Sequence, residues 1–294
     1  MSATGISAES GVGSPCDRSG EGRLIVGVDD DGIPEGVLRW IVNRSSVFPR
    51  PILVVHAWHT AGRAALFGLD RENAEAAVAQ PAAVAVAELR QHQLDATAMP
   101  ILGGAAEALL SQAEAGDEIV LGVVEGRSTR HSVLPSVVHE VLHHADCPVV
   151  IVPTMWRPRI GAVLQVLVGV DDSTRSRAAE AWAIEEAARL GADLQLVYVG
   201  LDNEPVALRT GRDSTLLAEA RSCAAALGLP LTITVVEVSG IERGSALALV
   251  EAARDAYALV LGNHRASWLA KVTQMSITER AAWNTSCPIV VVPS

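Results

Sequence analysis

The sequence lacks the features that mark membrane proteins, nucleic-acid-binding proteins and secreted proteins. No apolar run among its 294 residues approaches the roughly 20 residues that a membrane-spanning helix needs. Positive charge does not prevail either: the formal net charge is −11, which disfavours non-specific binding to nucleic acid or to an anionic membrane. The first 22 residues have no apolar segment, so they predict a disordered tail and not a signal peptide.

Cysteine is scarce, and recognisable catalytic motifs are absent. The four cysteines show no disulfide-like clustering, which predicts reduced structural thiols and a cytoplasmic protein; they are Cys16, Cys147, Cys223 and Cys287. The sequence holds no Walker-type lysine loop, no Ser-His-Asp arrangement with an identifiable nucleophile turn, and no nucleic-acid-binding motif. We therefore expect no committed catalytic residue and neither a nucleic-acid nor a membrane partner.

What the sequence does have, it has twice. Gly27 and Gly169 stand in the matching segments LIVGVDD and VLVGVDD, and each is followed thirteen residues later by a tryptophan. Apolar segments that end in Gly122 and Gly262 recur with an offset of 140, and so does the Cys-Pro segment after each of them. Three landmarks in one order at nearly constant spacing indicate two homologous domains produced by a tandem duplication.

The repeat sets the expected domain boundaries. We predict a tail at 1–22, a first domain at 23–153, a linker at 154–163 and a second domain at 164–294. In each domain short apolar runs, typical of strands buried on both faces, alternate with amphipathic helical stretches. Such alternation predicts a parallel sheet with helices on both faces. The strands are expected near Leu24, Ile52, Ala96, Ile119 and Val149, and near Val166, Leu194, Leu231, Ala258 and Ile289.

Taken together, these landmarks resemble the universal stress protein family in its tandem form, from Arg23 to Ser294. The resemblance implies an α/β fold of two doubly wound, Rossmann-like five-stranded parallel sheets with strand order 3-2-1-4-5. Val26 and Val168 are then expected on central strands, and Val150 and Val290 near an edge. Family members commonly pair through the fifth strand, which implies an internal pseudo-dimer of the two halves and leaves a homodimer open.

The resemblance also implies a nucleotide site in each half. Family members that bind ATP carry Gly-x2-Gly-x9-Gly-Ser after the fourth strand, together with a first-strand aspartate followed by glycine. The positions at which this chain keeps the pattern are the predicted cofactor-binding residues: Asp29, Gly122 and Ser136 in the first half, and Asp171, Gly262 and Ser276 in the second.

Both predicted sites depart from the family pattern. The second and third glycines are replaced by Glu125 and Pro135 in the first half, where Gly126 lies one residue late, and by Arg265 and Met275 in the second. Asp30 and Asp172 replace the first-strand glycine. A non-glycine residue forced into a left-handed conformation costs roughly 1–2 kcal/mol, and about 1.4 kcal/mol is tenfold in affinity. We therefore predict weakened binding of ATP or AMP in both halves.

Three functions stay open on the sequence alone. The first is a stress-response regulatory or ligand-sensing module with degenerate nucleotide-binding loops, in which the aspartates and serines only cap helices. The second is an ATP-binding protein with slow hydrolysis. The third is a zinc metalloprotease, because His139-Glu140-Val-Leu-His143 matches H-E-x-x-H. No third ligand follows at a familiar spacing and the second copy lacks the histidine pair, so we expect no metal site.

A few other side chains carry weaker expectations. Trp40 and Trp182 lie on the apolar face of the first helix of each copy and are predicted to pack in the core. The run from Asp29 to Asp31 predicts a solvated turn in preference to a magnesium site. His56 and Tyr198 end the second strand of each copy, near the predicted cleft, and are candidates for ligand contact.

Overall fold

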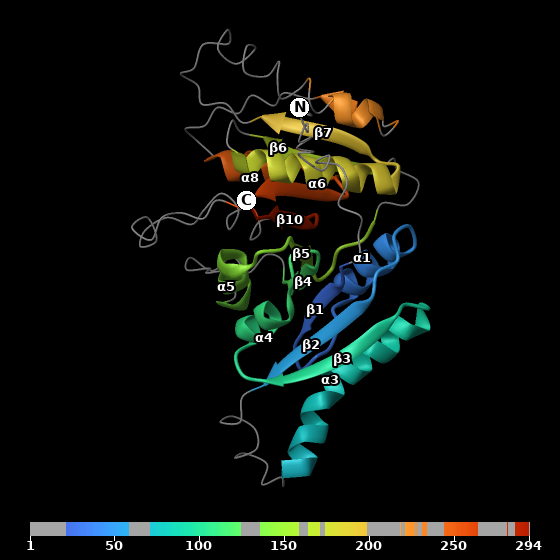
Figure 1. The fold of residues 1–294 in the computed structure, drawn as a ribbon, viewed down its shortest axis with the longest axis vertical. Helices are drawn as coiled ribbons and strands as arrows, with labels where there is room; N and C mark the ends of the chain where they lie inside the picture. Colours follow the sequence, from blue (N-terminus) through green and yellow to red (C-terminus); the bar gives the residue numbers. More distant parts are fainter. Residues whose placement is uncertain are drawn as a thin grey trace, which may run out of the picture.

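The fold was analysed in a computed structural model. It describes residues 22–58, 71–124, 136–158, 164–170, 174–198, 218, 221–226, 228, 231–233, 244–263, 281 and 286–293. Strands and helices alternate along the first half (Figure 1). The first half contains β1 (Leu24–Val28), α1 (Glu35–Ser45), β2 (Ile52–Trp58), α3 (Arg71–Gln91), β3 (Ala96–Leu102), α4 (Ala105–Gln112), β4 (Glu118–Val123), α5 (Ser136–His144) and β5 (Val149–Pro153). The second contains β6 (Gln165–Val170), α6 (Thr174–Leu190), β7 (Asp193–Tyr198), β8 (Leu231–Ile233), α8 (Gly244–Ala252), β9 (Ala258–Gly262) and β10 (Ile289–Val292).

All ten strands belong to one sheet, in the order β3-β2-β1-β4-β5-β10-β9-β6-β7-β8. Within each half the order is therefore 3-2-1-4-5, and every pairing inside a half is parallel. The predicted α/β fold class and strand order are confirmed.

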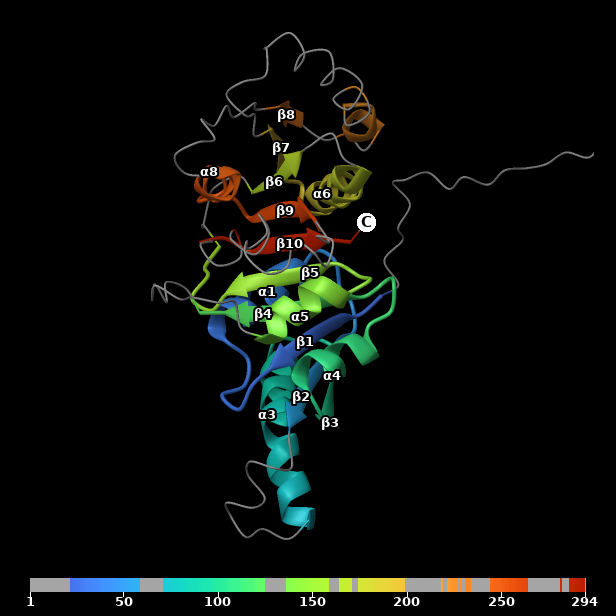
Figure 2. The ribbon, with the colours of Figure 1, turned by 90° about the vertical axis from the view of Figure 1, so that its left-hand side faces the viewer.

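The two halves meet through their fifth strands. β5 and β10 pair antiparallel, with Val150 opposite Val290. The expectation that these valines lie near an edge holds only inside each half, because the join places them at the middle of the ten-stranded sheet. Figure 2 shows the two halves stacked on either side of this join. The halves thus form the internal pseudo-dimer that the resemblance implied.

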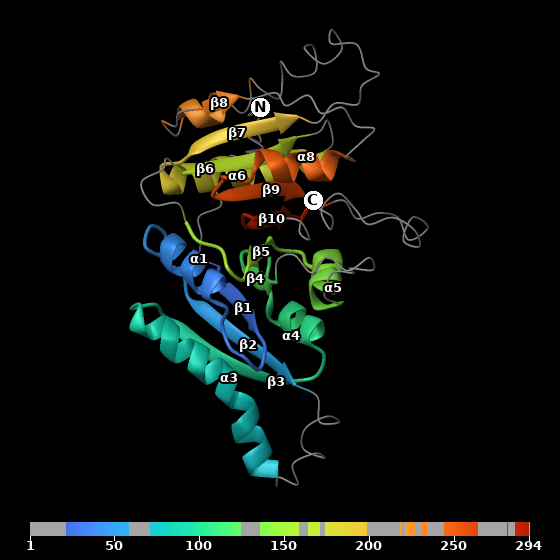
Figure 3. The same ribbon diagram turned by 180° about the vertical axis from the view of Figure 1, so that it is seen from behind.

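Helices cover both faces of the sheet. One core cluster gathers side chains of α1, α3 and α6 on one face, and the other gathers those of α4, α5 and α8 on the opposite face. Figure 3 shows the molecule from behind, with α4, α5 and α8 along one side of the strands. Trp40 is fully buried and Trp182 is 6% exposed, so the predicted core role of both tryptophans is confirmed.

Local sequence explains where the helices begin and end. Pro34 precedes α1 in an extended conformation (φ −63°, ψ 144°), as proline allows at a helix start. Gly191 follows α6 with φ +59°, the left-handed conformation that glycine adopts after a helix. No helix among the described residues is long and apolar enough to cross a membrane.

Candidate functional site

The carboxyl ends of the strands are the edge at which doubly wound sheets bind ligands, where the strand order reverses. In the first half that reversal lies between β1 and β4. The two strands pair from Leu24–Glu118 to Val26–Val120, although β1 continues to Val28 and β4 to Val123. In the second half β6 and β9 likewise stop pairing at Val168–Val260. Each half therefore has a place where two carboxyl strand ends run on without pairing to each other.

A tight acidic turn follows β1 at this edge. The Asp29 carboxylate accepts a hydrogen bond from the N–H of Asp31 (3.0 Å), and the Gly32 N–H donates to the carbonyl of Asp29 (3.2 Å). Gly32 has φ +87°, a conformation that favours glycine. The interpretation of Asp29 as a helix cap is wrong, because α1 begins after Pro34 and receives no side-chain cap. The solvated turn predicted for this run is what the structure contains, since Asp29, Asp30 and Asp31 are all exposed.

His56 lies beside this turn. It stands opposite Val28 in the β1–β2 register, and its side chain is buried. Its Nε2 lies 3.4 Å from Oδ1 of Asp30, the residue that replaces the family glycine. The strand register therefore brings a buried imidazole and an exposed carboxylate together at the candidate site, a pairing that sequence reasoning did not anticipate.

Gly122 lies near the end of β4 and has a packing role. A Cβ placed there would lie 3.0 Å from Cγ of Pro34 and 3.2 Å from Cγ2 of Val37. The start of α1 therefore approaches the strand closely, and this contact accounts for glycine without any ligand. Ser136, the third first-half residue, is exposed at the first position of α5.

Fewer of the second-half candidates can be placed. Gly262 ends β9, at the position equivalent to Gly122. Asp171 and Ser276 lie outside the described residues, and so do Glu125, Gly126, Pro135, Asp172, Arg265 and Met275. Tyr198 ends β7 opposite Val170.

Asn263 is a buried residue that sequence reasoning missed. It follows Gly262 at the position where the first half has Val123, and its side-chain amide donates to the carbonyl of Leu142 (2.7 Å). This bond ties the carboxyl end of β9 to the last turn of α5, which belongs to the other half. A polar residue at a position that is apolar in the other copy was the signal available in the sequence.

The histidine pair of the H-E-x-x-H sequence lies on α5. The rings of His139 and His143 are 4.4 Å apart and tilted by 55°. Within the part of the chain that the structure describes, no group of three or more His, Cys, Asp or Glu side chains could hold a metal ion. The pair alone does not provide the three protein ligands of a catalytic zinc site.

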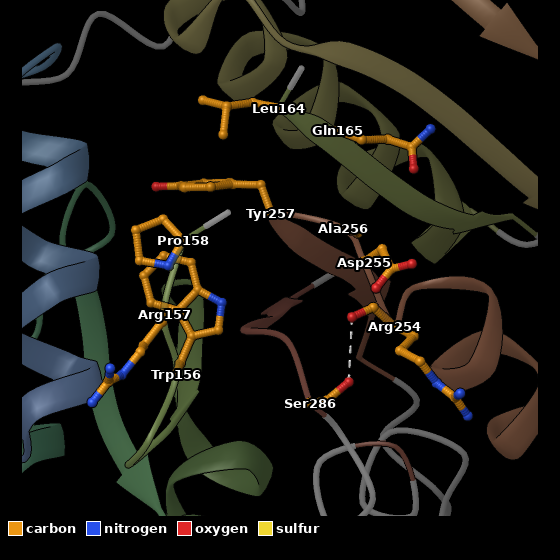
Figure 4. Close-up of a pocket in the computed structure, with 10 residues that line it drawn as sticks. All are labelled: Trp156, Arg157, Pro158, Leu164, Gln165, Arg254, Asp255, Ala256, Tyr257 and Ser286. Carbon is orange, nitrogen blue, oxygen red and sulfur yellow. Dashed lines mark hydrogen bonds between the residues drawn. The ribbon is translucent and has the colours of Figure 1, made fainter. Parts of the chain in front are cut away.

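A small cavity lies away from both edges, where residues 156–158 meet the amino ends of β6 and β9 (Figure 4). Trp156 packs edge-on against Tyr257 there, with ring centroids 5.9 Å apart, while Arg157 and Arg254 contribute charge. Its volume is about 60 Å³, far below the roughly 300–1,000 Å³ of small-molecule pockets. The cavity can hold a few water molecules but not a nucleotide.

Comparisons with known proteins agree with this fold. The universal stress protein family matches residues 22–153 and again residues 164–293. A universal stress protein of Mycolicibacterium smegmatis is 26% identical over 282 residues, covering 92% of this chain and 96% of its own. The crystal structure of a universal stress protein from Archaeoglobus fulgidus superposes with a TM-score of 0.70 at 16% identity, covering 93% of this chain and 98% of that one. A family protein of Pseudomonas aeruginosa gives 0.57 at 15% identity, with 94% of each chain covered.

The fold is an α/β architecture of two doubly wound units, each with the strand order expected of this family. With two family matches that together span most of its length, the chain belongs to the universal stress protein family, in tandem form.

Proposed function

We propose that this tandem universal stress protein is a regulatory, ligand-sensing module and not a committed enzyme. Its ligand is an adenine nucleotide, bound weakly at the carboxyl strand edge of each half. The proposed contacts are Asp29, Gly122 and Ser136 in the domain at 23–153, and Asp171, Gly262 and Ser276 in the domain at 164–294.

The observation that carries the proposal is the acidic turn at the first-half edge. Asp29, Asp30 and Asp31 expose three carboxylates beside the point where β1 and β4 stop pairing. Each carboxylate repels a phosphate by roughly 1 kcal/mol at 4 Å in water, and by more where water is excluded. Asp30 stands where ATP-binding relatives have glycine, so the same substitution adds charge and removes backbone freedom. Nucleotide binding there needs a divalent cation to offset the charge.

The packing of Gly122 supports the same conclusion. The start of α1 already occupies the space beside it, and Pro135, thirteen residues further along the sequence, has no N–H to donate to a phosphate. These features support a half that has the strand edge of a ligand site but lacks part of the family's phosphate-binding pattern.

We also propose that the protein is cytoplasmic, and the state of its thiols supports this proposal. Cys147 is buried and forms no disulfide, and burial raises its pKa to about 12, with Asp117 and Glu118 adding to the rise. A buried thiol of this kind is structural and unreactive, and an unoxidised thiol is typical of a reducing compartment.

The test is calorimetric titration of the full chain with ATP and with AMP, each with and without Mg²⁺. We expect binding weaker than micromolar, and strengthened by Mg²⁺. The variant Glu125→Gly with Pro135→Gly should bind ATP at least about tenfold more tightly, since it restores glycine at two positions of the family pattern where a non-glycine residue costs roughly 1–2 kcal/mol. The matched second-half variant, Arg265→Gly with Met275→Gly, should gain less, because it also removes a cation that attracts phosphate.

The same experiment distinguishes this weak-binding module from the alternative, an ATP-binding protein with slow hydrolysis. ATP retained through purification, micromolar affinity in the unmodified chain, or phosphate release above the buffer rate would favour that alternative and contradict the weak-binding proposal.

A further inference from the structure

Two equivalent positions of the repeat meet each other in the core of the molecule. Arg44 on α1 and Glu186 on α6 are 142 residues apart, the same offset as Gly27 and Gly169. The Arg44 guanidinium donates to both carboxylate oxygens of Glu186, from Nε at 2.6 Å and from Nη2 at 2.9 Å. Both side chains are at most 2% exposed. The contact lies where the two pseudo-symmetric helices approach each other, on the face that α1 and α6 share.

The surroundings of Arg44 come from both halves. Its guanidinium lies 5.2 Å from the ring centre of Trp40 and 5.7 Å from that of Trp182, which are themselves equivalent residues. It also donates to both oxygens of Glu118 on β4, and Arg50 donates to the same carboxylate at 2.8 Å. The cluster of Arg44, Arg50, Glu118 and Glu186 is buried and has no net formal charge.

This neutrality depends on which halves are combined. The first half contributes Arg44, Arg50 and Glu118, a net charge of +1. In the second half the positions equivalent to Arg50 and Glu118 are Ala192 and Ala258, so Glu186 alone contributes, a net charge of −1. Two first halves joined in the same way would bury a charge of +2, and two second halves would bury −2 with no cation between them. Buried charge without a partner is strongly destabilising.

We propose that Arg44 and Glu186 form a matched pair that selects the partner of each half. The interface accepts a first half joined to a second half and rejects two halves of the same kind. The single-domain ancestor of such a repeat would have carried one residue at both positions, and their divergence into opposite charges makes the two surfaces complementary and no longer self-complementary.

A buried tyrosine near the cluster cannot offset an excess charge in it. The Tyr257 side chain is buried, and its hydroxyl, which points toward α1 in Figure 4, has no hydrogen-bond partner among the described residues. Burial raises the pKa of Tyr257 and the Glu186 carboxylate raises it further, so the phenol stays neutral. A neutral phenol cannot compensate an excess charge of either sign at this place.

Charge reversal in the full chain tests the proposal. Arg44→Glu and Glu186→Arg should each lower the Tm by on the order of 10 °C, because each leaves like charges buried together. The double variant should recover about half of the summed loss, because Glu at 44 again faces Arg at 186. A double variant whose Tm falls by the full sum of the two single losses would overturn the proposal, since additive losses mean that the two side chains act independently of each other.

The control uses an exposed ion pair on the same helix. Glu35 and Arg39 are bonded i to i+4 near the start of α1. Reversing either one should change the Tm by only about 1–2 °C, as is typical of surface pairs.

A second measurement covers variants that fail to fold alone. The Arg44→Glu chain and the Glu186→Arg chain have complementary halves, so co-expression with different tags should yield a soluble one-to-one complex of two chains that exchange halves. The unmodified chain, whose halves already match, should not exchange in this way. Insoluble chains under co-expression, or equal exchange by the unmodified chain, would contradict pairing selectivity.

Discussion

The two halves share one fold but bury different chemistry. The first half holds Arg50 and Glu118 in its core, where the second half has Ala192 and Ala258. Next to Glu118, the Asp117 carboxylate forms an ion pair with Arg23, with Nη2 of the arginine 2.9 Å from Oδ2. The second-half residue equivalent to Asp117 is Tyr257. The second half forms the same five strands in the same order without these ion pairs. These buried ion pairs are therefore not what specifies the fold; the ion pairs of Arg44 with Glu118 and Glu186 lie at the contact between the halves.

Glycine use shows both the likeness and the difference. A Cβ on Gly27 would lie 2.8 Å from Cδ2 of Leu121, and one on Gly169 would lie 2.8 Å from Cδ2 of Leu261. The repeated glycine therefore serves the same leucine contact in each half. Gly36, in contrast, is matched by Ala178, although a Cβ on Gly36 would meet the backbone of Pro153 and Trp156.

The largest loss of stability is expected from a substitution that removes the buried contact between the halves. Arg44→Ala leaves Glu186 and Glu118 buried without their shared cation, and it should lower the free energy of unfolding by about 3–5 kcal/mol. Urea denaturation measures the loss. The control is Arg39→Ala on the same helix, which should cost about 1 kcal/mol or less; equal losses in the two variants would mean that the buried cluster contributes nothing special.

The next effect concerns pH. Burial alone would raise the pKa of Glu118, but the guanidinium groups of Arg44 and Arg50 outweigh burial and hold it below its usual value of 4.5. With the folded pKa depressed, the contribution of Glu118 to stability is fully present above about pH 4.5 and is lost as the pH falls through the folded pKa.

Glu118→Gln should therefore cost about 1.5–3 kcal/mol at neutral pH, and the difference from the unmodified chain should shrink on acidification. Denaturation curves between pH 7 and pH 3 measure it. The second half has Ala258 at this position, so Ala258→Gly offers a control whose cost should not vary with pH. A pH-independent cost for Glu118→Gln would refute this role of the ion cluster.

A smaller effect sharpens the glycine comparison. A Cβ on Gly36 would lie 2.2 Å from the carbonyl oxygen of Pro153 and 2.7 Å from the backbone N of Trp156. Gly36→Ala should destabilise by about 1–2 kcal/mol, because the backbone must shift to admit the added Cβ, and that shift would disturb the hydrogen bond from the Gly36 N–H to the Thr154 carbonyl. This reverses the roughly 1 kcal/mol that alanine normally gains over glycine in a helix. Ala178→Gly is the matched control, and its free energy of unfolding should fall only by the roughly 1 kcal/mol of the helix preference.

Strand positions were the most predictable part of this fold. The fifth strand of the second half was predicted near Ile289 and is observed as Ile289–Val292, because a strand buried on both faces must be a continuous apolar run. The end of α6 is equally local: Gly191 follows the amphipathic stretch and has a positive φ. These features depend on neighbours a few residues away, which the sequence displays directly.

The contact between the halves and the details of the site could not be predicted in the same way. Arg44 lies four residues after Trp40, on the same helical face, so its burial could have been predicted from the sequence. Its partner Glu186 lies 142 residues away, and no local sequence pattern connects the two. Asp29 matched a helix-cap pattern, yet Pro34 starts the helix instead. The close contact of α1 with Gly122 depends on tertiary packing and leaves no local signal.

The smallest expected effect concerns the histidine pair, which only the first half has, since Trp283 stands where His143 would recur. His143→Ala removes a ring contact with His139 on a nine-residue surface helix and should change the free energy of unfolding by about 0.5 kcal/mol or less. His144→Ala, the exposed neighbour, is the control and should behave alike. Elemental analysis of the purified chain should find no stoichiometric zinc in either variant or in the unmodified protein. One zinc per chain that disappears with His143→Ala but persists with His144→Ala, together with peptide cleavage, would instead give the first half a metal chemistry that the second lacks.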